Sequence, residues 1–155
     1  MIEIIRAEEK HVTAIGKLWW ELMIFHQNID HIFTPVEGSS LSFEENMVRR
    51  LMRSADGLAL VALDDAKVVG FSLEEIKNTP GFRRGKLGFI SDMAVLTSHR
   101  RRGIGGMILK EIPQWCVSKN ITRVELQTAA LNAVSNSFWE KQSFEINLHT
   151  RFKEI

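Results

Sequence analysis

The sequence predicts an α/β fold in which helices flank one mixed sheet. Apolar runs with the two-residue period of strands alternate with segments whose apolar residues recur every three or four positions, as in helices. The predicted order is a strand, two helices, a run of strands, and then helix, strand, helix and strand. The chain has 155 residues, of which 45% are hydrophobic. These totals predict a single domain over residues 1–155.

Charge and cysteine content restrict the environment and the partners of the protein. The formal net charge is +1, with 20 Lys and Arg against 19 Asp and Glu, so no overall field favours nucleic acid or an anionic membrane. The only cysteine is Cys116, which excludes an internal disulfide and favours a reducing compartment. Residues 1–6 lack the basic region and long apolar run of a signal peptide or membrane span. We therefore expect a soluble, cytoplasmic protein.

The N-terminal part of the chain predicts a strand, a long helix and a loop. A β-branched apolar run at 2–5 predicts the strand, and residues 8–27 predict an amphipathic helix. Pro, Gly and Ser interrupt the periodicity in 28–42, which predicts a loop long enough to shape a substrate site. Ser42, followed three residues later by Glu45, predicts a capping box at the start of a second helix.

The remainder of the chain predicts an antiparallel hairpin followed by alternating helices and strands. Two apolar runs, 58–63 and 67–76, are joined by a turn short enough for a hairpin. The later elements are a strand over 87–96, a helix over 103–118 that Pro113 should kink, a strand over 121–128, a helix over 132–142 and a strand over 143–153.

A glycine-containing loop between an apolar strand and a helix carries the clearest chemical signal. It reads Arg100-Arg101-Arg102-Gly103-Ile104-Gly105-Gly106. Glycines lack a Cβ atom, so the backbone can approach a large polyanion. Unpaired N–H groups at a helix N-terminus favour phosphate, and flanking arginines add charge-assisted hydrogen bonds. The loop therefore predicts a phosphate or pyrophosphate site.

Other phosphate-binding and metal-binding classes fit the sequence poorly. A nucleoside-triphosphate P-loop requires Gly-Lys-Ser/Thr, whereas Met107 follows Gly106. A dinucleotide fold places its glycines near the first strand, whereas this loop falls two-thirds of the way along the chain. Asp30 and His31 are adjacent, but two ligands make no metal site, so we expect no metal. A nucleic-acid role for the arginines of the chain is disfavoured by the near-zero net charge.

The pattern Arg100-x-x-Gly103-x-Gly105 resembles the signature Gln/Arg-x-x-Gly-x-Gly/Ala of the GNAT family of N-acetyltransferases. The resemblance extends over essentially all 155 residues and implies the GNAT-type sheet, mixed and largely antiparallel. Besides the loop, it rests on Val68-Val69-Gly70-Phe71, on the strand Ile90 to Val95, on Asn132-Ala133-Val134, and on Phe138-Trp139-Glu140-Lys141-Gln142-Ser143-Phe144.

The resemblance implies acetyl-CoA as co-substrate and assigns residues to it. Backbone groups of Met93, Ala94 and Val95 would pair with the pantetheine arm. Asn132 would contact the cofactor from the last helix. The pyrophosphate would be held by the glycine loop, that is by Arg100, Arg101, Arg102, Gly103, Ile104, Gly105 and Gly106.

The implied activity is transfer of an acetyl group to a primary amine of a small molecule or a peptide, by direct attack in a ternary complex. Such an amine, with a pKa near ~10.4, must first lose a proton to a base. Where relatives often carry a glutamate base this chain has Ser91, and strand alternation turns Asp92 to the opposite face unless a bulge intervenes. The candidate bases are therefore Asp92, Glu74 and His26.

Two departures from the family leave a second function open. The frequent tyrosine acid is replaced by Trp139, and the chain contains no tyrosine. With Ser91 in the position of the base, the alternative is a catalytically silent acyl-CoA-binding module. The resemblance and the apolar sheet edges also suggest a homodimer.

Overall fold

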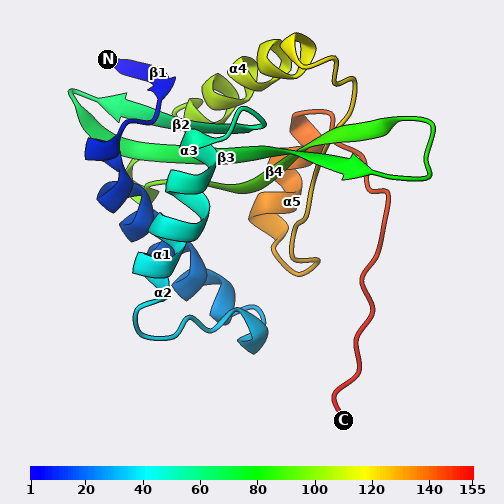
Figure 1. Ribbon diagram of the computed structural model, residues 1–155. Coiled ribbons are helices and arrows are strands. Elements are labelled where there is room, and N and C mark those ends of the chain that lie inside the picture. Colours follow the sequence, from blue (N-terminus) through cyan, green and yellow to red (C-terminus); the bar gives the residue numbers. More distant parts are fainter.

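A five-stranded mixed sheet forms the centre of the computed structural model, which describes all 155 residues (Figure 1). Its strands follow one another in sequence order, and every neighbouring pair is antiparallel except the last, β4 with β5. The predicted α/β fold with a mixed, largely antiparallel sheet is thus confirmed. The strands are β1 (Ile2–Arg6), β2 (Gly57–Asp64), β3 (Lys67–Thr79), β4 (Gly85–Val95) and β5 (Val124–Leu126).

Helices cover both faces of the sheet. On one face lie α1 (Val12–Gln27) and a continuous helical stretch made of α2 (Ser39–Phe43), a π-helical segment (Glu44–Arg49) and α3 (Arg50–Arg53). On the other face lie α4 (Ile104–Ser118) and α5 (Ala133–Lys141). Short 3-10 turns occupy Glu9–His11, His31–Phe33 and Thr97–His99. No helix is long and apolar enough to cross a membrane.

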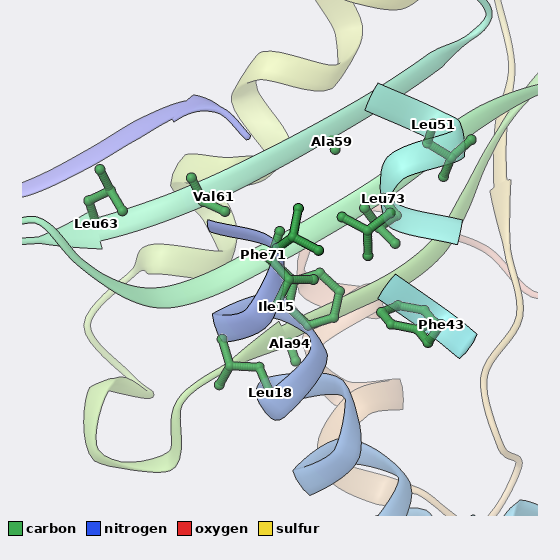
Figure 2. Packing of buried hydrophobic residues seen from close by; sticks show 12 residues of the cluster. Ile15, Leu18, Phe43, Leu51, Ala59, Val61, Leu63, Phe71, Leu73 and Ala94 are labelled. Carbon is green, nitrogen blue, oxygen red and sulfur yellow. The ribbon is translucent and has the colours of Figure 1, made fainter. Parts of the chain in front are cut away.

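Each face of the sheet has its own hydrophobic core. Figure 2 shows the core under α1, where Ile15, Phe71 and Leu73 are fully buried. The ring of Phe43 stacks on Trp19 with centroids 4.5 Å apart. The opposite core gathers Ile90 with the inner residues of α4. Strand side chains alternate between the two faces. A residue of β3 or β4 that lies in the first core therefore faces α1, and one that lies in the second core faces α4.

The predicted hairpin is confirmed as β2 and β3. Its two turn residues, Asp65 and Ala66, have φ values of 47° and 65°. Positive φ at both positions is the geometry of a type I′ turn, whose twist matches that of the flanking strands.

The predicted capping box is wrong. The helical stretch begins at Ser39, directly after Gly38, whose φ of 80° reverses the chain there. Ser42 therefore lies inside the helix, and its Oγ accepts a hydrogen bond of 3.0 Å from Asn46. The loop predicted over 28–42 is correspondingly shorter and contains the turn His31–Phe33, which Asp30 caps through the Ile32 N–H at 3.1 Å.

The predicted last strand, 143–153, is also wrong, and that over 121–128 is reduced to the short β5. After α5 the chain is irregular, and every residue of 145–155 is exposed (Figure 1, red). A two-residue apolar period forms a strand only where a neighbouring edge is available to bond with it. In this single chain the segment runs away from the sheet and meets none. Through Pro113, by contrast, α4 continues without interruption to Ser118.

Candidate functional site

Strands β4 and β5 pair over only three residues of β4 and then separate. The parallel pairs run from Gly88 with Val124 to Ile90 with Leu126, and β4 continues alone to Val95. Beyond Ile90, one edge of β4 therefore has no strand beside it. A free strand edge offers N–H and C=O groups to an extended ligand.

The register of β4 with β3 decides which backbone groups face this free edge. The Leu96 N–H donates to the Val69 carbonyl at 2.8 Å, and bonding direction alternates along an antiparallel ladder. Met93 and Val95 thus direct their polar backbone groups to the open side, whereas Ala94 directs its groups toward β3. The Val95 carbonyl accepts a hydrogen bond of 3.0 Å from Nε of Arg100, which leaves its N–H open.

A β-bulge at Ser91 divides β4 into two parts. Leu73 lies opposite Asp92 and Glu74 opposite Ile90, so Ser91 has no partner on β3. Residues directly opposite one another share a face of the sheet. Asp92 therefore faces α1 together with Leu73, and Glu74 faces α4 together with Ile90.

Asp92 occupies a half-buried position beside α1. Burial raises the pKa of its carboxyl to about 7, and a hydrogen bond with Trp19 offsets part of this effect. A carboxyl with a pKa near 7 exists in both protonation states at neutral pH, which suits a group that accepts and releases a proton. The structure thus gives Asp92 the electrostatic character of a general base.

Glu74 is in a different environment, fully buried against α4. Neither carboxyl oxygen has a hydrogen-bond partner, and burial raises its pKa to about 8, with nearby Ser72 acting in the opposite direction. It is therefore mostly protonated at neutral pH and lies across the sheet from Asp92. The pKa of the Cys116 thiol is also raised, first by burial and then by the charge of Glu74, which keeps the thiol protonated and unreactive.

His26 lies two helical turns beyond Trp19 on α1. Its Nδ1 is 2.8 Å from the Leu22 carbonyl, and its ring contacts Phe33 edge-on at 5.4 Å. These contacts attach the turn His31–Phe33 to the end of α1. The structure does not bring His26 into contact with Asp92 or Glu74.

The glycine loop presents an open helix N-terminus. Gly103 precedes α4 with φ of 78° and offers no capping side chain, so the N–H groups of the first helical turn are free to bind a ligand. A Cβ atom at Gly106 would meet nothing within 4 Å. A Cβ at Gly105 would lie 2.8 Å from the Phe138 ring. Gly105 is thus required by packing against α5, whereas Gly106 leaves space at the surface.

The three arginines of the loop differ in their surroundings. Arg100 bonds to Val95, and Arg101 is exposed with φ of 61°. Arg102 lies 3.3 Å from Asp64 at the end of β2, and Nε2 of His99 lies 3.4 Å from the same carboxyl. Asp64 thereby attaches the glycine loop to the central hairpin. No sequence pattern had pointed to Asp64, because its partners lie far along the chain.

The predicted cofactor residue Asn132 and the nearby Trp139 both make contacts within the fold. Asn132 is buried and caps α5, because its Oδ1 accepts the Ser135 N–H at 3.1 Å. Trp139, which replaces the family's tyrosine, donates its indole N–H to the Ser135 hydroxyl at 3.1 Å. Its ring packs between Phe138 and Phe144. Trp139 is therefore part of the aromatic packing that holds α5.

Two hollows lie near the functional candidates, one between α4 and β5 and the other between α1 and β4. A groove of about 630 Å³ extends from the start of α4, at Gly103 and Gly106, to Ile90 where β4 and β5 separate. A smaller hollow of about 80 Å³ lies between α1 and β4, with Glu21 and Arg100 among its polar residues. The groove thus begins at open N–H groups that can bind an anion, and the smaller hollow forms a pocket under α1. No group of three or more metal-ligating side chains is present.

Comparison with known structures shows the same fold in several proteins. A mutant of the BH1408 protein from Bacillus halodurans superposes with a TM-score of 0.87 at 19% identity over 99% of both chains. AAC(6')-Iy in complex with the bisubstrate analogue CoA-S-monomethyl-acetylneamine gives 0.77 at 17% identity over 100% of this chain and 98% of that one. AAC(6')-Ih from Acinetobacter baumannii, an aminoglycoside antibiotic 6'-N-acetyltransferase, gives 0.73 at 18% identity over 100% and 99%.

Comparison by sequence identifies the family. No curated protein matches the sequence significantly. The model of the acetyltransferase (GNAT) family, however, matches residues 18–144. This range includes the second half of α1, the hairpin of β2 and β3, the bulged strand β4, the glycine loop and α5. The chain therefore belongs to the GNAT family of acetyltransferases.

Proposed function

We propose that the protein transfers an acetyl group from acetyl-CoA to a primary amine that enters from the α1 side of β4. The observation that carries this proposal is the bulge at Ser91. It lies where β4 separates from β5, and it is followed directly by Asp92, whose pKa is about 7. Family membership supports acetyl-CoA as the co-substrate.

The start of α4 and the free edge of β4 together suit an extended, phosphate-bearing ligand. Free N–H groups at the start of α4 favour a pyrophosphate, and Gly106 leaves space for its close approach. Arg101, which is exposed beside them, supplies a cation. Met93 and Val95 offer backbone groups to the amides of a pantetheine arm in the manner of an added strand. Asn132 is proposed to line the same cleft from α5.

Asp92 is proposed to remove the proton from the amine. An alkylamine is almost entirely protonated at neutral pH, and a base with a pKa near 7 has both the correct charge and sufficient driving force. Because Trp139 donates its N–H to Ser135, no side-chain acid is expected for the leaving thiolate. A thiol pKa near ~8.5 makes protonation by solvent adequate. Positioning of the two substrates supplies the larger part of catalysis.

The acceptor is proposed to be a small amine. The pocket between α1 and β4 holds only about 80 Å³ and combines Glu21, which attracts a cation, with apolar residues such as Leu18 and Leu22. Several structurally similar proteins are described as aminoglycoside acetyltransferases. An aminoglycoside is much larger than this pocket and could place only its reacting amino group there, so short alkylamines are the first acceptors to test and aminoglycosides the second. The cytoplasm is the proposed location, in keeping with the free thiol of Cys116.

Calorimetric titration with acetyl-CoA tests the cofactor site. We expect the wild type to bind and Gly106→Asp to bind at least about tenfold more weakly, a change of about 1.4 kcal/mol, because the carboxylate would repel the pyrophosphate. An acidic residue in the first turn of a helix favours the helix, so folding should be preserved. Gln114→Glu adds the same charge at an exposed position of α4 and should bind normally. Equal binding by all three proteins would refute this site.

A silent acyl-CoA-binding module is the second candidate, favoured by the structural bonds of Trp139. The two functions differ in turnover. Release of free CoA thiol over a panel of amines, measured with a thiol reagent, supports the enzyme. Tight acetyl-CoA binding without turnover of any amine supports the module.

A further inference from the structure

Asp64, the last residue of β2, is the common partner of three nitrogen groups. Its Oδ2 lies 3.3 Å from a guanidinium nitrogen of Arg102 and 3.4 Å from Nε2 of His99. Its Oδ1 lies 3.3 Å from the amino group of Met1. The Asp64 side chain is only 22% exposed. A carboxylate with partners on both oxygens and little contact with water fixes those partners better than an isolated surface ion pair does.

Two of these partners lie on either side of a strained residue of the glycine loop. His99 ends the turn Thr97–His99, and Arg102 follows three residues later. Between them Arg101 has φ of 61°. A residue with a side chain disfavours this left-handed conformation, which persists only where surrounding contacts fix it. His99 and Arg102 supply such contacts before and after Arg101, through one and the same carboxylate.

The conformation of this stretch decides where the free N–H groups of the loop point. Gly103, with φ of 78°, is a second left-handed residue and directly precedes α4. Left-handed residues of this kind occur in nests, where successive N–H groups are directed at one anion. The direction of the N–H groups at the start of α4 therefore depends on a backbone that Asp64 helps to fix.

The two arginines next to Gly103 differ in the availability of their charge. Arg101 is exposed and forms no ion pair with a carboxylate. The guanidinium of Arg102 is directed to Asp64, which offsets its positive charge. Arg101 is thus free to meet an anionic ligand, whereas Arg102 is already bound within the protein.

We propose that Asp64 and Arg102 are positioning residues of the cofactor loop: the carboxylate fixes Arg102 and His99, and through them the backbone N–H groups that bind the pyrophosphate of acetyl-CoA. The inference rests on the proposed function, because it assigns roles within the same site. Arg102 then holds the loop in shape and does not itself bind phosphate, as the family resemblance had implied.

The proposal predicts an effect of Asp64 opposite in sign to that of simple electrostatics. A carboxylate near a phosphate site repels the ligand, so by charge alone its removal would strengthen binding. If Asp64 positions the loop, its removal instead leaves a mobile loop that acetyl-CoA must order, and binding becomes weaker. The direction of the change therefore separates the two explanations.

Calorimetric titration with acetyl-CoA measures this direction, at a temperature at which circular dichroism shows every variant to be folded. We expect Asp64→Asn to raise Kd about three- to tenfold. The matched control is Asp65→Asn, which removes the same charge from the next residue. Asp65 is 94% exposed and contacts only the Met1 amino group, so its Kd should equal that of the wild type. Unchanged or tighter binding by Asp64→Asn overturns the proposal.

A double-mutant cycle tests whether Arg102 acts through Asp64. Arg102→Gln should weaken binding by about the same factor as Asp64→Asn, and the double variant by no more than either, because all three lose one contact. In turnover assays the KM for acetyl-CoA should rise and kcat at saturation should stay unchanged. Losses that add in the double variant would give Arg102 a phosphate contact of its own and overturn its positioning role.

Limited digestion with trypsin tests the loop without any ligand, since the enzyme cleaves after Arg100, Arg101 and Arg102. We expect cleavage at these sites to be at least about threefold faster in Asp64→Asn than in the wild type, and unchanged in Asp65→Asn. Equal rates in all three proteins would overturn the positioning by Asp64. A wild type that fails to bind acetyl-CoA would refute the proposed function, and the trypsin comparison would still decide whether Asp64 fixes the loop.

Discussion

Asp92 and Glu74 are carboxyl groups on adjacent strands, yet they lie in opposite environments. Asp92 is half-buried beside α1, lies near Trp19 and borders the open edge of β4. Glu74 is fully buried under α4 without a hydrogen-bond partner for either oxygen. Burial raises the pKa of both, to about 7 and about 8. The comparison teaches that a raised pKa alone does not identify a base, since access to the site is also required.

The largest expected effect is the loss of activity in Asp92→Asn. We expect kcat/KM to fall roughly 10²- to 10⁴-fold, because an amide cannot accept the proton of the amine. Binding of acetyl-CoA, measured by calorimetry, should be unchanged. In the wild type kcat/KM should rise with pH and level off above about 7, and this limb should be absent from the variant. Asp56→Asn, at an exposed position, serves as control, and full activity of Asp92→Asn would exclude it as the base.

Glu74→Gln should instead change stability and leave turnover nearly intact. The pKa of Glu74 rises from 4.5 to about 8 on folding, because burial disfavours the charged carboxylate. The contribution of Glu74 to the free energy of unfolding is therefore complete below pH 4.5 and is lost as pH rises through 8. This increase in pKa corresponds to at most about 5 kcal/mol of unfolding free energy. Thermal melts between pH 5 and 9 should show Tm falling in the wild type and much less in the variant. The neighbouring change Glu75→Gln should follow the wild-type curve.

Gly105 and Gly106 are adjacent in the loop, but the structure gives them different roles, one in packing against α5 and the other in leaving space for a ligand. Gly105→Ala places a methyl group 2.8 Å from Phe138 and should lower the free energy of unfolding by about 1 to 3 kcal/mol. The methyl group of Gly106→Ala would meet no atom within 4 Å, so this variant should lose little stability. Chemical denaturation of both variants checks this order, and equal losses would contradict the assigned contact.

The smallest expected effect concerns the end of α5. Ser143→Gly removes a side chain from a residue with φ of 64° and should raise stability by about 1 kcal/mol. Urea unfolding of wild type and variant measures the gain. Acetyl-CoA affinity should not change, since Ser143 makes no contact with the glycine loop in the described hydrogen bonds.

Much of this fold could be predicted from the sequence, because it depends on local patterns. The hairpin of β2 and β3, the helix α4 and the glycine loop each have a signal within a few residues. The position of Ser42 inside the helix could not be predicted in this way. The helix begins at Ser39, after the backbone reversal at Gly38, so Ser42 does not cap it. Whether residues 143–153 form a strand depends on a neighbouring strand edge to which they can bond, and no local sequence pattern shows whether such an edge is present.

The candidate site was only partly predictable for the same reason. The local sequence signals end at Ser91, where they leave a bulge only as a condition on which face of the sheet Asp92 takes. Which face each carboxyl takes depends on the register with β3, and this is a property of two strands. The contacts of Asp64 with Arg102 and His99, and of Phe138 with Gly105, likewise join residues far apart in the chain.

The bulge has a consequence for how the opening beside β4 is specified. Ser91 adds one residue to β4 without changing the partner of Ile90 or of Asp92. Removal of that residue would preserve both pairings and straighten the strand, so that hydrogen bonding to the neighbouring parallel strand could continue past Leu126. The width of the opening beside β4, which is the proposed substrate entrance, therefore depends on the number of residues in the strand and not on the chemistry of its side chains. Among related chains, an insertion or deletion at this point would be more informative about activity than the identity of the inserted residue.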